Sequence, residues 1–589
     1  MSVDTQTRER IECLSDLWRR DPCFDEHTRE QVSALSEDEL FDAFYTDLTF
    51  GTAGLRGILG VGTNRMNIYV VRKAAQALCD AIRHEGNEGC ARGVVIAYDS
   101  RHCSALFARE TARVLAANGV RSYGFSGIRP TPQLSFAVRH LNCIAGVMIT
   151  ASHNPKEYNG FKVYWEDGSQ VGLDKAELIT RLRDENKDWR VSVPVGDGWE
   201  KIWHTIVDED VDAAYYNAVS DTMLQPVLSR DRGGDLSVVY TPLHGAGLVP
   251  TLYMLQHAGF VNVHVVEEQA QPDGDFPTVL APNPEDHRTL ELALGLAERQ
   301  SADLVLASDP DGDRVIAATR DKDGSYRVFT GNQMGALLLH YIIEQRRASN
   351  TLPANAVAVK SIVSSDLAEV VASSNGVQMR NVHVGFRFIG EEILSMEQSE
   401  LGTFLFGFEE SLGFLAGTYT RDKDAVATAV LLCEAALYYK VTKGIGLGEV
   451  LDAVFEQYGY YVDITTSVEL AGIQGLRTIE SISERLRSNP PTSLGGVHVT
   501  VCEDYLTQTA SNLLDGTEKP IELPANDVLR FLLEGGGTVS ARRSGTEPKM
   551  KFYYSLPCTS KEEGFDLHDM IEKDLFSRLP DLLDKPEPD

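Results

Sequence analysis

The chain has 589 residues, 43% of them hydrophobic, and this length predicts three to five domains with their own cores rather than one. Its 55 basic and 86 acidic residues leave a net charge of −31, which disfavours binding to nucleic acid or to an anionic membrane. A phosphorylated ligand is also anionic, so a site for one must gather arginine and lysine locally.

The cysteines and the chain ends favour a cytoplasmic protein. The nine cysteines are odd in number and scattered, without a Cys-x-x-Cys pair, so we expect neither a disulfide framework nor a zinc site. The first ten residues are polar, and the last five carry no sorting or lipidation signal. The longest apolar stretch, 425–439, is interrupted by Thr428 and Glu434 and predicts a buried helix rather than a membrane span.

Helical and strand patterns alternate along most of the chain, which predicts βαβ units with parallel strands. The first unit has helices at 69–84 and 106–118 and extended segments at 93–98 and 121–125. After the charged segment 184–200, the second has helices at 211–223 and 248–258 and strands at 236–240, 262–266 and 304–307.

A third α/β unit and a different last domain follow. The third unit opens at Gly331, with helices at 335–346, 365–374 and 425–441 and a strand at 356–360. Beyond Tyr460 the elements become shorter and richer in strand, which predicts an α+β domain. Its strands are expected at 460–470, 497–501, 528–533, 538–541 and 551–555.

Ser152, in Thr-Ala-Ser-His-Asn-Pro at 150–155, follows the apolar run 144–149. A serine before Asn-Pro is commonly a turn or capping residue. However, the end of a strand is where open α/β sheets place their ligands, and a second polar loop, 309–314, follows another buried strand. The pairing of the two loops favours a chemical role for Ser152.

The second loop, Asp-Pro-Asp-Gly-Asp-Arg at 309–314, alternates three carboxylates and ends in Arg314. Mg²⁺ suits such a loop, because it takes few protein oxygens and leaves room for phosphate. An EF-hand does not fit, since the sixth and twelfth positions are arginines. A phosphatase with Asp309 as nucleophile is the third reading, although Asp313 after the glycine favours metal binding. A solvated turn is disfavoured, because three carboxylates at this density repel one another without a cation.

Glycine-rich segments add candidate grips for phosphate and sugar. Arg56 lies among the glycines of 50–57, and segment 541–548 combines guanidinium, hydroxyl and backbone N–H groups, which suits an oxyanion. Segment 407–413 places Glu409 and Ser411 on one loop, where they suit sugar hydroxyls or form an ordinary turn. Segment 421–424 is equally well read as the charged start of the helix that follows it.

Six segments, in this order, resemble the α-D-phosphohexomutase superfamily: 50–67, 150–162, 308–314, 407–413, 421–424 and 542–548. Residues 64–67 and 149–164 are most similar to its phosphoglucomutase/phosphopentomutase branch. The resemblance implies four domains around a central cleft: three α/β units with mixed sheets and a C-terminal α+β domain of the TBP-like sort. Their expected bounds are 1–208 with a phosphoserine loop, 209–325 with a metal loop, 326–458 with a sugar-recognition loop, and 459–589 with a phosphate-binding loop.

The resemblance also implies a role for each matching residue. Ser152 matches the serine that carries phosphate, and its oxygen completes a Mg²⁺ site made by Asp309, Asp311 and Asp313. Arg56 and Arg314 match arginines near the transferring phosphoryl group, His153 and Lys162 match residues that move or position a proton, and Lys423 matches a lysine of the substrate pocket. Glu409 and Ser411 match the sugar-recognition pair. The grip on the non-reacting phosphate is matched by Arg542, Ser544, Gly545 and Thr546.

The implied activity is a phosphosugar mutase working through phosphoserine and a sugar 1,6-bisphosphate. Serine at position 411 resembles the residue of glucose- or mannose-using relatives and favours a hexose, and we expect glucose. Phosphopentomutase, phosphomannomutase and glucose 1,6-bisphosphate synthase stay open as activities of the same class. Outside that class stand the Asp-nucleophile phosphatase and a non-catalytic protein that binds sugar phosphates. The sequence leaves the oligomeric state open.

Overall fold

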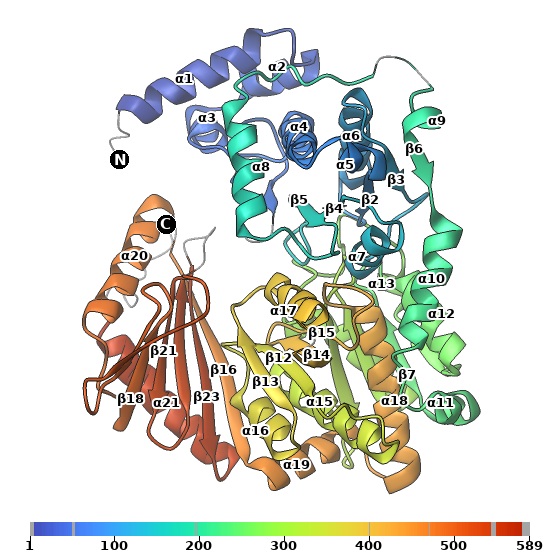
Figure 1. Cartoon of the computed structure of the whole chain (residues 1–589), viewed down its shortest axis with the longest axis vertical. Helices are drawn as coiled ribbons and strands as arrows, with labels where there is room; N and C mark the ends of the chain where they lie inside the picture. The colour runs from blue at the N-terminus through green and yellow to red at the C-terminus, as the bar shows by residue number, and fades with distance from the viewer. Residues whose placement is uncertain are drawn as a thin grey trace. The chain divides into compact units, whose positions relative to one another are not determined.

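The computed structural model describes residues 5–49, 54–194, 196, 198–399, 401–470, 472–543 and 549–579. The chain folds into two compact units. The first consists of Met1–Val328, Gly390–Ser399 and Gly413–Gly444, and the second of Phe329–Ile389, Glu400–Leu412 and Ile445–Asp589. Figure 1 labels the helices and strands of both units.

The first sheet of unit 1 is mixed, with strand order β1-β5-β4-β2-β3-β6. β2, β3, β4 and β6 run parallel, as the βαβ pattern predicts, whereas β5 runs antiparallel to both β4 and β1. The strands are β1 (Leu55–Ile58), β2 (Val94–Tyr98), β3 (Ser122–Gly124), β4 (Ala145–Ile149), β5 (Tyr158–Trp165) and β6 (His204–Ile206).

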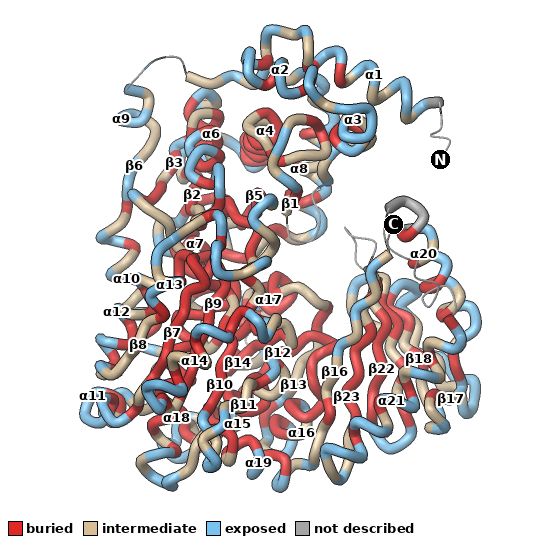
Figure 2. Tube along the Cα trace, turned by 180° about the vertical axis from the view of Figure 1, so that it is seen from behind, coloured by how far each residue is buried: buried red, intermediate tan, exposed pale blue. Residues whose placement is uncertain are grey.

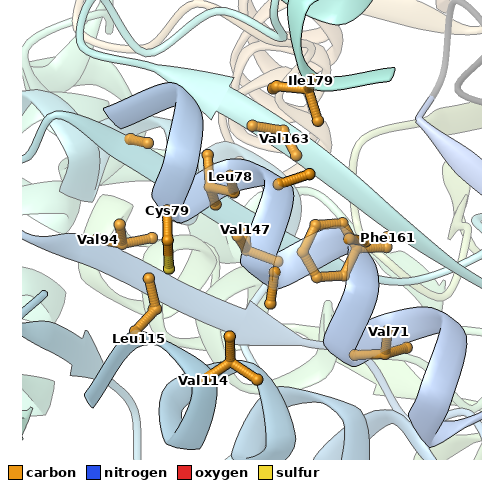
Figure 3. Close-up of a cluster of buried hydrophobic side chains, with 14 of the residues drawn as sticks. Val71, Leu78, Cys79, Val94, Val114, Leu115, Val147, Phe161, Val163 and Ile179 are labelled. Carbon is orange, nitrogen blue, oxygen red and sulfur yellow. The ribbon is translucent and has the colours of Figure 1, made fainter. Parts of the chain in front are cut away.

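Helices cover this sheet and close its core. In Figure 3 Leu78 and Cys79 of α4, Val147 of the sheet and Ile179 of α8 meet in one apolar cluster. Burying such side chains stabilises the domain by ~1.5–3 kcal/mol each. The helices are α4 (Ile68–His84), α5 (Asn87–Arg92), α6 (Ser104–Ala117), α7 (Thr131–His140), α8 (Leu173–Glu185) and α9 (Glu200–Trp203).

Three N-terminal helices precede this core: α1 (Thr5–Arg20), α2 (Glu26–Ala34) and α3 (Glu37–Phe44). Their surfaces are largely exposed (Figure 2), and an aromatic cluster holds them to α4. Trp18 stacks on Phe24 at 4.4 Å between ring centroids, and both contact Tyr69.

The second sheet of unit 1 has the order β11-β10-β9-β7-β8. β7, β8 and β9 are parallel and β10 and β11 antiparallel, so this sheet extends to Val328, past the predicted domain end at 325. The strands are β7 (Val238–Thr241), β8 (Val263–Val265), β9 (Leu304–Ser308), β10 (Val315–Arg320) and β11 (Tyr326–Val328). The helices are α10 (Asp208–Ser220), α11 (Pro226–Arg232), α12 (Leu248–Ala258), α13 (Glu267–Ala270) and α14 (Glu291–Gln300), with 3-10 turns at Gly233–Asp235 and His287–Leu290.

Helix α18 (Ala425–Lys443) packs against α12, β9 and β10, although the predicted domain bounds assign it to the third domain. In the described part of the chain it is the one helix long and apolar enough to cross a membrane, and 78% of its apolar window is buried. The helix is therefore a core element of unit 1, as its interrupted apolar run predicts.

Unit 2 contains the parallel strands β12 (Ala356–Ser361), β13 (Gln378–Val382) and β14 (Thr403–Glu409). Helices α15 (Gly331–Ala348), α16 (Asp366–Ser374) and α19 (Leu447–Tyr458) belong with them. Helix α17 (Phe386–Ser399) runs from unit 2 into unit 1, to which β15 (Gly413–Leu415) also belongs.

The C-terminal domain is an antiparallel sheet of order β16-β23-β22-β21-β18-β19-β20, which confirms the predicted change to an α+β layer. Its strands are β16 (Tyr460–Glu469), β17 (Ser493–Leu494), β18 (Val497–Asp504), β19 (Thr509–Asn512), β20 (Glu518–Pro520), β21 (Val528–Leu533), β22 (Thr538–Arg543) and β23 (Lys549–Cys558). Helices α20 (Gly472–Ser488) and α21 (Lys561–Ser577) accompany the sheet.

Candidate active site

The loop after β4 holds Ser152 in a sharp, buried turn. Ser152 is 2% exposed and has a left-handed φ of 52°, which is uncommon for a residue with a side chain. Its N–H donates to Thr150 Oγ1 at 2.8 Å. Gly160 of β5 permits the loop to pack this closely, because a Cβ there would lie 2.4 Å from the Thr150 carbonyl oxygen.

The loop after β9 brings Asp309, Asp311 and Asp313 together. All three are at most 2% exposed, and one carboxylate oxygen from each lies within 4.8 Å of the others. Gly312 has a φ of 63°, which lets the chain turn back into β10. The two loops meet, because Ser152 Oγ donates to Asp309 Oδ2 at 2.8 Å.

The three aspartates differ in how many of their oxygens are hydrogen-bonded to the protein. Asp309 Oδ1 accepts the backbone N–H groups of Asp313 and Arg314 at 3.1 and 3.0 Å. Asp311 Oδ2 accepts from Thr131 Oγ1 at 3.0 Å and from Lys162 Nζ at 2.8 Å. The Oδ1 atoms of Asp311 and Asp313 are buried without a hydrogen-bond partner among the described residues.

This arrangement fits a divalent cation. Burial and the charges of Asp311 and Asp313 raise the pKa of Asp309 well above its usual range. Burial also opposes ionisation of Asp311, but the Lys162 ammonium, a hydrogen bond with Asp309 and the charge of Lys423 together outweigh that effect and lower the pKa of this carboxyl. Oxygen atoms left unpaired in a buried carboxylate cluster are the donor set of a hard cation such as Mg²⁺.

Two lysines lie against the aspartates. Besides its bond to Asp311, Lys162 Nζ is 3.8 Å from Asp313 Oδ2. Lys423 Nζ is 3.2 Å from the same oxygen and donates to Asp422 Oδ1 at 3.0 Å. Asp422 is fixed in turn by the Tyr164 hydroxyl at 2.7 Å. The structure thus brings both predicted lysines to the carboxylate cluster.

Segment 421–424 makes contacts that bear on two interpretations: the charged start of a helix, and a part of the functional site. Asp424 caps α18, because its Oδ1 accepts the Ala427 N–H at 3.0 Å, which is the structural role. Lys423 beside it lies 3.2 Å from Asp313 Oδ2, and its expected role in the substrate pocket stays a prediction.

Two arginines and a histidine complete the surroundings of Ser152. Arg56 Nη1 donates to Asn154 Oδ1 at 2.8 Å, and Arg314 Nε is 3.8 Å from Asp313 Oδ1. His153 Nδ1 is 3.3 Å from Ser152 Oγ. Burial, followed by the charges of Arg314 and Arg56, lowers the pKa of His153 well below its usual value.

The predicted sugar and phosphate grips belong to unit 2. Glu409 ends β14, is 4% exposed, and accepts the Gly385 N–H at 2.6 Å through Oε1. Ser411 and Arg542 are half-buried. Ser544, Gly545 and Thr546 lie outside the described residues, as do residues 50–53 of the first glycine-rich segment.

Comparison with known proteins decides the family. The three α/β domain models of phosphoglucomutase/phosphomannomutase match residues 47–189, 213–324 and 330–458. The phosphoglucomutase of Staphylococcus aureus strain MSSA476 is 38% identical over 554 residues, which cover 93% of this chain and 96% of the relative. The chain belongs to the phosphoglucomutase/phosphomannomutase family. This confirms the predicted superfamily and the expectation of a mutase enzyme.

Solved structures share the fold of this family member. A putative phosphomannomutase from Thermus thermophilus has a TM-score of 0.66 at 23% identity and covers 90% of this chain and 99% of that one. The open form of parafusin, a phosphoglucomutase from Paramecium, has a TM-score of 0.65 at 17% identity and covers 90% and 96% of the two chains. At these identities the likeness concerns the fold alone.

Asp99, Arg101 and Thr150 form a buried network behind the serine loop of this phosphoglucomutase/phosphomannomutase family member that the sequence analysis missed. Asp99 and Arg101 follow β2, which pairs in parallel with β4. Because parallel strands end at the same sheet edge, polar residues after β2 are neighbours of Ser152. Arg101 lies outside the glycine-rich segments, so its position after β2 is the one signal in the sequence that could have pointed to it.

Proposed function

We propose that the chain is a phosphosugar mutase that interconverts hexose 1-phosphate and hexose 6-phosphate, with glucose as the preferred sugar. The observation that carries this proposal is the 2.8 Å bond between Ser152 Oγ and Asp309 at the edge of three buried carboxylates. The relative that is 38% identical is named phosphoglucomutase, which supports the reaction and the sugar.

In this proposal Ser152 is the phosphate carrier. The bond between phosphorus and Ser152 Oγ breaks as one forms to the free hydroxyl of a sugar monophosphate, which yields a sugar 1,6-bisphosphate. The bisphosphate turns over and returns its other phosphate to Ser152, so the product is the isomeric monophosphate. The bisphosphate is thus both intermediate and activator.

Asp309, Asp311 and Asp313, with an oxygen on Ser152, would hold Mg²⁺. The bound ion supplies positive charge to the phosphoryl oxygens, where most of the catalysis of phosphoryl transfer lies. Arg56 and Arg314 supply further positive charge from the protein, against a chain whose net charge is −31.

The proton of the attacking hydroxyl must leave as the new bond forms. His153 Nδ1 lies 3.3 Å from Ser152 Oγ and can exchange a proton with it on the return step. Lys162 donates to Asp311, so we assign it to positioning the carboxylate. Lys423 has the same kind of contact with Asp313. This assignment separates two residues whose roles the resemblance leaves open.

Sugar recognition falls to unit 2 in this proposal. Glu409 and Ser411 would bind sugar hydroxyls, and Arg542, Ser544, Gly545 and Thr546 would hold the non-reacting phosphate. That grip must accept either end of the sugar in turn, since the bisphosphate reverses between the two transfers. Phosphopentomutase, phosphomannomutase and bisphosphate synthase activities would use the same site with a different sugar or phosphate donor.

The compartment is part of the proposal. The nine cysteines are all free thiols, and we place the enzyme in the cytoplasm, where thiols stay reduced.

Turnover of Ser152→Ala and Asp309→Asn tests the mechanism. With glucose 1-phosphate, Mg²⁺ and trace glucose 1,6-bisphosphate, Ser152→Ala is expected to lose at least ~1,000-fold in kcat, because the acceptor oxygen is gone. A phosphatase with Asp309 as nucleophile predicts a mild effect of Ser152→Ala and phosphate release as the main product.

Mannose 1-phosphate and ribose 1-phosphate in the same assay test the sugar, and a higher kcat/KM for ribose 1-phosphate would contradict the hexose assignment.

A further inference from the structure

The guanidinium of Arg101 donates hydrogen bonds to several backbone carbonyls of residues 152–158, here called the serine loop. Arg101 is 3% exposed and follows β2. Its Nη2 donates to the Ser152 carbonyl oxygen at 2.5 Å and also to that of Asn154. Its Nη1 donates to the carbonyl oxygens of Pro155 and Tyr158 at 2.8 and 3.1 Å. Four carbonyls of a seven-residue stretch therefore depend on one side chain.

Asp99 ties this guanidinium to the backbone of Ser152. Its Oδ2 lies 3.4 Å from Arg101 Nε and accepts the Thr150 hydroxyl at 2.6 Å. The Thr150 oxygen in turn accepts the Ser152 N–H at 2.8 Å. Both the N–H and the carbonyl of Ser152 are thus held through groups anchored on Asp99.

An aromatic ring from the second domain of unit 1 covers the guanidinium. Phe276 is 1% exposed, and its ring centroid lies 5.0 Å from the Arg101 Cζ, which is cation–π distance. The neighbouring Asp275 contacts His102 and Lys156 at 3.2 and 3.3 Å. The segment that carries Phe276 therefore packs against Arg101 and contacts the serine loop through Lys156.

This network offsets two unfavourable features of a serine that carries phosphate: its left-handed backbone and the partial negative charge of nearby carbonyls. A serine resists the left-handed φ of 52° unless its surroundings impose it, and fixed N–H and carbonyl groups impose it here. Four carbonyl oxygens also place partial negative charge behind a group that becomes an anion when phosphorylated. A guanidinium that donates hydrogen bonds to all four offsets that charge.

We propose that Arg101 is the positioning residue of the serine loop, with Asp99, Thr150 and Phe276 as its supports. Arg101 bonds to the backbone and acts on the reaction through the direction it gives to Ser152 Oγ. The proposal rests on the proposed function, in that Ser152 is taken as the phosphate carrier.

Variants of Arg101 and of a second, partly buried arginine that forms an ion pair elsewhere in the same domain test the proposal. Arg101→Lys keeps the charge without the planar fork, and Arg101→Met removes both. Arg72, which pairs with Glu110 at 2.6 Å between α4 and α6, provides the control Arg72→Met. For each variant we would measure Tm, kcat and KM, and, on enzyme phosphorylated by glucose 1,6-bisphosphate, the rates of phosphoserine hydrolysis and of transfer to glucose 1-phosphate.

A positioning role predicts that both Arg101 variants lose about 100-fold in kcat while KM changes less than about threefold, as for a reacting group displaced by about an ångström. The rate of phosphoryl transfer from phosphoserine to glucose 1-phosphate falls, while the rate of phosphoserine hydrolysis does not. The Arg72→Met control lowers Tm but leaves kcat unchanged. The proposal is overturned if Arg101→Lys keeps wild-type kcat, or if transfer and hydrolysis fall together in proportion to the loss of Tm.

Two further outcomes are distinguished by separate measurements: failure of the Arg101 variants to fold, and failure of the proposed function itself. If neither Arg101 variant folds, Phe276→Leu decides the matter: lower kcat at a Tm like that of the Arg72 control supports the role, and wild-type kcat overturns it. If wild-type enzyme takes no phosphate on Ser152 from the bisphosphate, the proposed function fails, whatever the Arg101 variants do. Normal phosphorylation of Ser152 in wild type and Arg101→Lys, with equal transfer rates, refutes the role of Arg101 alone.

Discussion

At the scale of the residue, three aspartates that look equivalent in the sequence have different surroundings. Asp309 accepts two backbone N–H groups and the Ser152 hydroxyl, Asp311 accepts Lys162, and Asp313 faces Lys423. The alternating pattern predicts the cluster, since it places carboxylates on one turn. The alternating pattern does not reveal which groups bond to each carboxylate. Those groups come from β5, α7 and the segment before α18. The different surroundings of the three aspartates therefore required the structure.

Asp309→Asn tests the repulsion inside the cluster. Since its pKa is raised by burial and by Asp311 and Asp313, a neutral amide removes repulsion and is expected to raise Tm in metal-free buffer. A ligand that binds only the folded protein stabilises it more when its affinity is higher, so Mg²⁺ should raise the Tm of wild type and much less that of the variant. Thermal unfolding with EDTA or with Mg²⁺ measures both effects. Equal stabilisation of the two proteins by Mg²⁺ would contradict a metal role for Asp309.

At the scale of the element, buried and well-bounded segments were predictable. Strand β21 (Val528–Leu533) and helix α12 (Leu248–Ala258) have the predicted bounds, because continuous apolar runs or helical spacing end at polar or glycine residues. The antiparallel strands β5 and β10 were missed, since their apolar residues lie next to the motif loops and were read with them. Pairing direction depends on the partner strand and is absent from local pattern.

At the N-terminus of α18, Asp424 accepts several hydrogen bonds. Asp424 caps the helix and also accepts the hydroxyls of Tyr215 and Tyr419 at 2.9 and 2.5 Å. Asp424→Ala removes the cap and leaves two buried hydroxyls without this acceptor, so we expect a loss of about 3 kcal/mol in the free energy of unfolding. Asp424→Asn keeps an acceptor oxygen and should lose clearly less. Urea unfolding measures both, and equal losses would show that the hydrogen bonds are not the cause.

At the scale of the whole molecule, buried charges join the third and C-terminal domains within unit 2. Lys360 is fully buried and donates to Asp366 Oδ1 at 3.3 Å, and Arg530 Nη2 reaches the same oxygen at 3.2 Å. Arg530 also pairs with Glu503 at 3.3 Å. Such charges are dispersed along the sequence between 360 and 530, so no local pattern predicts that they meet.

Asp463 of β16 makes this junction sensitive to pH. Burial, opposed by bonds from Ser555 and Ser365, raises the pKa of Asp463 from 3.8 to about 6. A carboxyl whose pKa is raised by folding stabilises the fold while protonated and loses that contribution as pH rises from about 4 through about 6. Asp463→Asn should therefore exceed wild type in unfolding free energy by about 2–3 kcal/mol at pH 7.5.

The same difference is expected to shrink at pH 5 and to vanish below the unfolded pKa. Urea unfolding at the three pH values measures it, with Asp566→Asn, an exposed substitution on α21, as the control. A constant difference across the pH series would contradict the shifted pKa of Asp463.

The central claim is that Ser152 carries the phosphate. The most direct measurement is to incubate the enzyme with Mg²⁺ and labelled glucose 1,6-bisphosphate, map the label by peptide mass spectrometry, and then add unlabelled glucose 1-phosphate or glucose 6-phosphate. The account predicts label on Ser152 that either monophosphate discharges into bisphosphate. Label on Asp309 in place of Ser152, or label on Ser152 that neither sugar removes, would contradict it.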